Sequence, residues 1–148
     1  MIKYIYILLF SIIFSVENIS DNILNSIDVE NKLGTLISGE TIIINEDAKI
    51  VSFQDFYDQE IPTILILAYY RCPMLCTLVL NGVSDALSKS ALIPGKDYNV
   101  LTVSIDPTEN PTIASEKKSN YITEYFPSEE LDFWTFGTTT QDQIDQIT

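Results

Sequence analysis

Residues 63–76 read TILILAYYRCPMLC: an apolar run of strand length, a break at Arg71, and two cysteines. A continuous apolar run is typical of a strand that is covered on both faces, as in a parallel sheet. Beyond the break, apolar residues recur at helical spacing, so we expect a helix from about Pro73 to Lys89. The stretch therefore predicts a buried strand that passes directly into a helix at the two cysteines.

The same alternation of strand and helix continues along the chain. Residues 98–105 form a second apolar run, which Asp106 and Pro107 end. The segments expected to follow are a helix over residues 111–125, a third core strand over 131–136 and the start of another helix from residue 140. Strands and helices that alternate in this way predict an α/β fold around a mainly parallel central sheet with flanking helices.

Upstream of the first buried strand, the sequence predicts a short hairpin. The β-branched residues 41–45 and the residues 49–51 flank a turn over 46–48. A brief helical turn over residues 53–57 is expected to follow, since Ser52 can cap it.

Length and charge restrict the class of protein. The chain has 148 residues, which is room for one domain. It carries 8 Lys+Arg against 21 Asp+Glu, a net charge of -13, so it repels nucleic-acid phosphates and we expect no nucleic-acid partner. Hydrophobic residues make up 46% of the chain, which excludes intrinsic disorder.

The residues that are scarce restrict the chemistry. The sequence contains no histidine, which excludes Ser-His and Cys-His catalysis and every zinc site that depends on imidazole. It contains two cysteines, too few for a small protein held together by disulfides. Any redox or metal chemistry therefore depends on these two sulfurs.

The amino terminus predicts export. A single charge, Lys3, precedes an uncharged run over residues 4–16, which is short for a bilayer span and typical of a secretory leader. We interpret residues 1–15 as a signal peptide or an N-terminal membrane anchor, 16–27 as a lead-in segment and 28–148 as the folded domain. Export to the periplasm would place the cysteines in an oxidising compartment, where thiols form disulfides unless they are reduced or bound to metal.

Cys72 and Cys76 are four residues apart where the strand hands over to the helix. Residues at i and i+4 share one helix face, within the range that a disulfide bridges and close enough for both sulfurs to bind one metal ion. Pro73 fits the first helical position, so both sulfurs would lie near the helix N-terminus. The free N–H groups there, and the positive charge of Arg71, favour thiolates.

The pattern leaves several chemistries open. A pair of thiolates with few hard ligands nearby prefers Cu(I), whereas a structural zinc needs four ligands. The spacing C-x-x-x-C also differs from the C-x-x-C of thioredoxin-like oxidoreductases. Spacing alone does not decide between redox exchange and metal binding, and two cysteines on an apolar helix face can also be buried core.

Three stretches resemble one known family. Residues 69–76, YYRCPMLC, with their continuation TLVLNG, closely resemble the copper-site segment of the Sco/SenC proteins. Residues 103–107, VSIDP, are similar to the second core strand of that family, and residues 42–56 to its hairpin. The resemblance covers about residues 28–148, and it implies a thioredoxin-like fold.

The resemblance also implies a function. Sco/SenC proteins are copper chaperones and thiol oxidoreductases, so Cys72 and Cys76 would be both copper ligands and the redox pair, with Asp106 as a supporting residue. The implied cargo is copper. The implied partner is the copper-centre subunit of cytochrome c oxidase, or another copper or thiol carrier, outside the cytoplasmic membrane.

The sequence departs from the family in one important respect. The third copper ligand of the family is a histidine beyond the last strand recognised here, and this chain has none before it ends at Thr148. Either the chain is truncated before its last strands, which the expected fold favours, or it is a short relative with a degraded copper site. With two sulfurs, we expect copper to bind weakly or with a ligand from the partner. Met74 is the other soft atom nearby, and we expect it to pack rather than to bind metal.

Three hypotheses follow from these observations. The first is a copper-binding assembly factor that uses Cys72 and Cys76. The second is an enzyme, a thiol–disulfide reductase in which one cysteine attacks and the other resolves. The third is an exported α/β module in which the two cysteines form an inert structural disulfide.

Overall fold

The computed structural model describes residues 34–57, 59–127 and 131–148, and the fold belongs to the unit of residues 36–148. The leader predicted over residues 1–15 and the lead-in segment over 16–27 lie outside the described residues. Within the described ranges, no helix is both long enough and apolar enough to cross a membrane.

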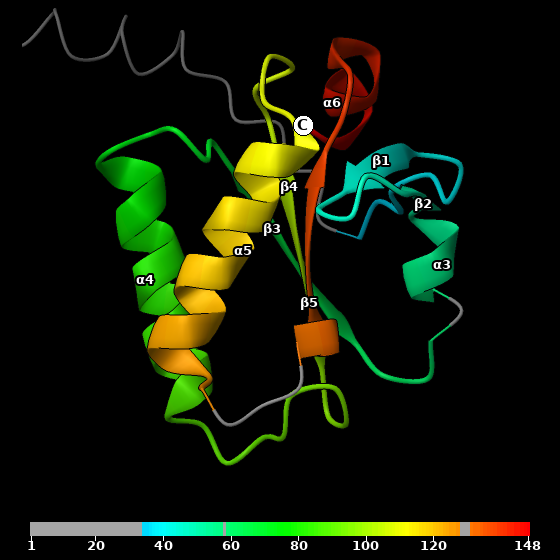
Figure 1. The fold of residues 1–148 in the computed structure, drawn as a ribbon. Helices are drawn as coiled ribbons and strands as arrows, with labels where there is room; N and C mark the ends of the chain where they lie inside the picture. Colours follow the sequence, from blue (N-terminus) through cyan, green and yellow to red (C-terminus); the bar gives the residue numbers. More distant parts are fainter. Residues whose placement is uncertain (1–33, 58, 128–130) are drawn as a thin grey trace, which may run out of the picture. The chain divides into compact units, whose positions relative to one another are not determined.

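Strands of the described residues form one sheet (Figure 1). They are β1 (Ile42–Asn45), β2 (Ile50–Ser52), β3 (Thr63–Ala68), β4 (Asn99–Ser104) and β5 (Trp134–Thr138), in the spatial order β2-β1-β5-β4-β3. The neighbours β3, β4 and β5 are parallel, whereas β1 is antiparallel to both β5 and β2. The structure thus confirms the mainly parallel α/β sheet and the hairpin of β1 and β2.

Helices cover both faces of the sheet (Figure 1). They are α3 (Gln54–Tyr57), α4 (Leu75–Ser88), α5 (Pro111–Tyr125), the 3₁₀ turn η1 (Leu131–Phe133) and α6 (Gln141–Ile147). Leu80 of α4 and Tyr121 of α5 belong to an apolar core on one face of the sheet. Phe56 of α3 and Ile147 of α6 belong to a second core on the opposite face. Strands β3 and β4 therefore contribute side chains to both cores, because successive residues of a strand point to opposite faces of the sheet.

The two central apolar runs differ in burial. In β4, Val100, Leu101 and Val103 are fully buried, as expected for a strand covered on both faces. In β3, Leu65 and Leu67 are only half-buried, so the expectation of complete cover is wrong for this strand. The reason is position, because β3 pairs with β4 alone and lies at the edge of the described sheet.

Helix α4 begins later than the sequence predicts. Its first residue is Leu75 rather than Pro73, and Met74 takes the N-cap position with φ -127° and ψ -79°. The first helical hydrogen bond runs from the Leu78 N–H to the Met74 carbonyl at 2.9 Å. The Cys72 carbonyl instead accepts a hydrogen bond from the Thr77 hydroxyl at 2.9 Å, so a separate turn precedes the helix.

The third core strand also begins later than the sequence predicts. The expected strand over residues 131–136 is replaced by η1 and by β5, which starts at Trp134. Phe133 packs edge-on against Phe126, with ring centroids 5.1 Å apart, and against Tyr98, at 6.3 Å. Phe133 therefore packs into the aromatic core from the turn η1 and not from a strand.

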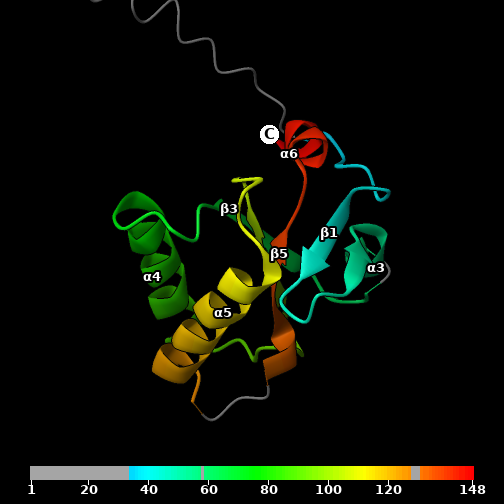
Figure 2. The same cartoon turned by 45° about the horizontal axis from the view of Figure 1, so that its top comes forward.

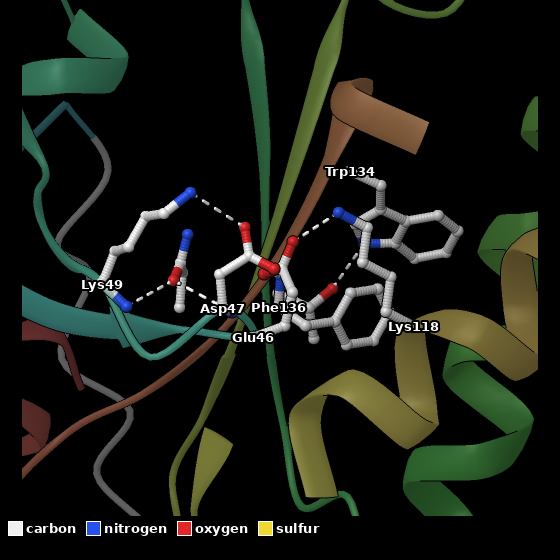
Figure 3. Close-up of polar contacts among 8 residues, drawn as sticks. Glu46, Asp47, Lys49, Lys118, Trp134 and Phe136 are labelled. Atoms are coloured by element: carbon white, nitrogen blue, oxygen red, sulfur yellow. Dashed lines mark hydrogen bonds and ion pairs between the residues drawn. The ribbon is translucent and has the colours of Figure 1, made fainter. Parts of the chain in front are cut away.

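A buried ion pair connects the hairpin with the rest of the sheet (Figure 3). Glu46, in the turn between β1 and β2, pairs with Lys118 of α5, and their side chains are only 8% and 15% exposed. The Glu46 carboxylate also accepts the backbone N–H of Phe136 in β5 at 2.9 Å. The Glu46–Lys118 pair therefore joins three elements that are far apart in the sequence.

Candidate functional site

The two cysteines lie where β3 ends and α4 begins, in the connection that Figure 2 shows at one end of the sheet. Cys72 belongs to the turn before the helix, and Cys76 is the second residue of α4. Because β3, β4 and β5 are parallel, this connection shares its edge of the sheet with the segment that follows β4. The carboxyl edge of parallel strands is the usual place for ligand sites in α/β sheets.

The structure brings the two predicted site residues together. Both are free thiols, and both are half-buried, so solvent reaches them. The Cys76 side chain is among the groups that lower the pKa of the Cys72 thiol. The Cys76 Sγ also accepts the backbone N–H of Tyr69 at 3.3 Å. We refer to Cys72 and Cys76 as the dithiol site.

Backbone N–H groups favour the thiolate form of Cys72. Hydrogen bonds to its sulfur from the backbone N–H of Cys76, and next from that of Met74, lower the pKa of the Cys72 thiol below its ordinary value of 9.0. A thiolate near the start of the helix is therefore favoured as predicted, but the position of Cys72 differs from the one expected. Cys72 lies outside the helix and faces the N–H groups of its first turn, instead of sharing a helical face with Cys76.

Asp106, the residue expected to support the site, lies in the segment that follows β4. The Asp106 carboxylate accepts hydrogen bonds from the Thr108 hydroxyl at 2.7 Å and from the Thr108 N–H at 2.9 Å. These bonds, and more weakly the positive charge of Arg71, lower the pKa of Asp106. Asp106 thus shapes the turn that ends β4.

Glu109 is a site residue that the sequence analysis missed. Its side chain is buried, at 5% exposure. One oxygen of its carboxylate, Oε1, accepts the backbone N–H of Arg71 at 2.7 Å, and the other, Oε2, accepts that of Tyr70 at 2.9 Å. Ser104 donates its hydroxyl to Oε2 at 2.5 Å. A glutamate in an acidic loop carries no sequence signal for burial, so the contact emerges only from the fold.

Tyr70 anchors the same turn in the core. Its hydroxyl oxygen lies 2.6 Å from the carbonyl oxygen of Gly137 and 2.9 Å from that of Thr102. Burial, and next the negative charges of Glu109 and Glu46, raise the pKa of Tyr70 well above 10.0. Tyr70 therefore remains a neutral hydrogen-bond donor at physiological pH.

The soft donors of the site are few. Within the described ranges of the chain, no group of three or more His, Cys, Asp or Glu side chains is placed to hold a metal ion. Met74 is 66% exposed, so the expectation that it packs is wrong. Met74 belongs to neither of the two apolar cores. The dithiol site thus offers two sulfurs, with a third sulfur nearby in sequence.

Known proteins resemble this chain in fold but not detectably in sequence. No protein-family model matches the chain, and no curated protein matches it. Solved structures do match. One is a candidate electron transfer protein from Aquifex aeolicus, with a TM-score of 0.65 and 21% identity over 78% of this chain and 66% of that one.

Two further matches are copper-bound ScoI structures. The Arabidopsis thaliana protein has a TM-score of 0.54 and 22% identity over 74% of this chain. The Bradyrhizobium japonicum protein has a TM-score of 0.52 and 22% identity over 76% of this chain. The chain spans 62% and 64% of the length of these two structures. At this level of identity the matches establish the architecture: residues 36–148 have the thioredoxin-like fold found in Sco structures.

Proposed function

We propose that this chain is a Sco/SenC-type copper-binding protein in which Cys72 and Cys76 hold Cu(I). Two independent observations support the proposal. The segment around the cysteines resembles the copper-site segment of that family, and the fold matches copper-bound ScoI structures. The observation that carries it is the dithiol site itself, two free and half-buried thiols where β3 passes into α4.

The donor set fits this metal. Thiolates are soft ligands that favour Cu(I), and the backbone N–H groups around Cys72 stabilise its thiolate form. Two sulfurs are too few for a structural zinc site, which needs four ligands. Copper is the cargo in this proposal, and a site with two protein ligands leaves room for a donor from the molecule that receives it.

The surroundings of the dithiol site suit a protein partner. Tyr69, Met74, Leu75 and Leu78 are 43%, 66%, 71% and 63% exposed, so apolar side chains flank the sulfurs. Exposed apolar patches commonly mark interaction sites. By the motif resemblance, the partner would be the copper-centre subunit of cytochrome c oxidase or another copper or thiol carrier. Residues 1–15 would export the domain or anchor it on the periplasmic side of the membrane.

A thiol–disulfide reductase is the second candidate, and the thiolate character of Cys72 favours it. In that reaction the Cys72 thiolate attacks a sulfur of a partner disulfide, and the partner's other sulfur leaves as a thiolate. Cys76 then attacks Cys72 in the mixed disulfide, which releases the reduced partner and leaves Cys72 and Cys76 oxidised.

Copper titration tests the leading proposal. We expect the reduced chain to bind one Cu(I) per molecule in competition with a chromophoric chelator, and the Cys72→Ser and Cys76→Ser variants to lose this binding. Met74→Leu is the matched control, since it removes the third sulfur and should keep the stoichiometry. Binding that is absent in the reduced chain, or undiminished after both cysteines are replaced, would exclude the copper function.

The reduction potential of the Cys72–Cys76 pair tests the second candidate. A reductase needs a potential within reach of its compartment, whereas structural disulfides fall below about -300 mV. Equilibration with thiol buffers of known ratio measures the value. A potential below that limit would identify the pair as structural and rule out the reductase.

A further inference from the structure

The buried carboxylate of Glu109 lies directly beneath the turn that carries Cys72. We propose that Glu109 is a positioning residue, which holds the Tyr70–Arg71 backbone and through it fixes the geometry of the dithiol site. The benefit of this positioning rests on the proposed function, whereas the placement of Glu109 rests on its own hydrogen bonds.

The carboxylate is the group that these contacts require. An ionised carboxylate accepts hydrogen bonds and donates none. Glu109 receives three donors, the N–H of Tyr70 and the hydroxyl of Ser104 on Oε2 and the N–H of Arg71 on Oε1. A glutamine in its place would keep one acceptor oxygen and turn an NH₂ donor toward a second donor. The site is therefore built for the charged residue and not for its neutral isostere.

The contacts reach the sulfurs through one or two peptide units. Arg71 directly precedes Cys72, so the orientation of its N–H fixes the peptide that enters the cysteine turn. On the other side, the N–H of Tyr69 donates to the Cys76 Sγ at 3.3 Å. Glu109 thus holds Tyr70 and Arg71. These two residues lie between Tyr69, which contacts the Cys76 sulfur, and Cys72.

The cost of burying a carboxylate supports a specific role. A charge that is 5% exposed loses most of its hydration, and charge-assisted hydrogen bonds must offset that loss. Tyr70 is already anchored by its own hydroxyl at the Gly137 carbonyl, 2.6 Å away. Tyr70 can therefore hold the turn against the core without Glu109. The role left for Glu109 is to orient the consecutive N–H groups of Tyr70 and Arg71.

The test compares Glu109→Gln with Glu116→Gln, an exposed glutamate of α5 that loses the same charge. We expect Glu109→Gln to shift the thiol–disulfide equilibrium of Cys72 and Cys76 with glutathione toward the disulfide by about tenfold, or about 30 mV. The reason is that a loosened turn no longer presents its N–H groups to the thiolate. Its Cu(I) affinity should fall by about 10- to 100-fold, the usual effect of losing an outer-shell partner. Glu116→Gln should change neither quantity.

An unchanged equilibrium in a folded Glu109→Gln variant would overturn the proposal and leave Glu109 with a role in stability only. If that variant does not fold, Glu109→Asp decides, since it keeps both oxygens on a shorter side chain. Its shorter reach must then shift the same equilibrium, and an equilibrium like that of the wild type overturns the proposal. Failure of the proposed function is a separate result, because it appears as absent Cu(I) binding in the unmutated chain.

Discussion

At the scale of single residues, Cys72 shows how a backbone controls a thiol. The main causes of its lowered pKa are the backbone N–H groups of Cys76 and Met74, and not a charged side chain. Its position one turn before the helix lets its sulfur face these N–H groups, whereas a cysteine on the helical face would point past them. The chemistry of the site thus depends on the turn as much as on the cysteine.

The pH dependence of alkylation checks this electrostatic effect. A lowered pKa means that the thiolate of Cys72 is half-formed below pH 9.0, so its reaction rate should rise at lower pH than that of an unfolded cysteine. The measurement is the rate of iodoacetamide labelling of the Cys76→Ser variant, which retains the backbone N–H groups. The same variant in concentrated urea is the control. Equal midpoints in the folded and unfolded chain would contradict the prediction.

At the scale of elements, the two long helices begin in different ways. Asn110 caps α5, because its side chain accepts the Ile113 N–H at 3.2 Å, and Pro111 follows at a position that needs no N–H. Met74 precedes α4 and makes no side-chain cap hydrogen bond. The first N–H groups of α4 are therefore available to the Cys72 sulfur, whereas Asn110 accepts those of Ile113 and Ala114 at the start of α5.

Removing the cap of α5 should weaken the fold by a predictable amount. We expect Asn110→Ala to lower the free energy of unfolding by about 1 kcal/mol, the usual loss for an N-cap side chain. Thr140→Ala is the matched control, since Thr140 precedes α6 without a side-chain cap hydrogen bond and should change stability little. Urea denaturation followed by circular dichroism measures both. Equal losses in the two variants would show that the Asn110 contact is not the cause.

At the scale of the whole domain, the Glu46–Lys118 pair joins the hairpin, α5 and β5. These elements are separated by about half of the chain, so the pair closes long-range contacts. Breaking a buried pair leaves one charge without its partner in a low-dielectric environment, which costs more than the pair itself contributes. The hairpin end of the sheet is therefore sensitive to either member.

Lys118→Met tests this sensitivity. We expect it to lower the free energy of unfolding by about 3 kcal/mol, because it leaves the Glu46 carboxylate buried and unpaired by Lys118. Lys49→Met is the control, since Lys49 and Asp47 form an exposed pair at 3.2 Å whose loss should have little effect. Thermal and urea unfolding measure both variants. Comparable small losses would mean that solvent reaches Glu46 in the folded domain.

The sequence alone was sufficient for features that depend on local pattern. The apolar runs, helical spacing and turn residues predicted the strands and α-helices described from Ile42 to Ile147 and the mainly parallel sheet, with shifts of a few residues at their ends, but not the 3₁₀ turn η1. The placement of Cys72 and Cys76 where a strand passes into a helix followed from the same patterns. The periodicity of strands and helices depends on residues that are close in the sequence.

Only the tertiary structure decided what depends on contacts between distant segments. The burial of Glu109 beneath Tyr70 and Arg71 joins residues 38 and 39 positions apart, and the edge position of β3 depends on which strands pair beside it. The turn that delays α4 to Leu75 follows Tyr70 and Arg71, the two residues that Glu109 holds from a distant loop. Local propensity has no information about such contacts, since they exist only once hydrophobic burial has brought the segments together.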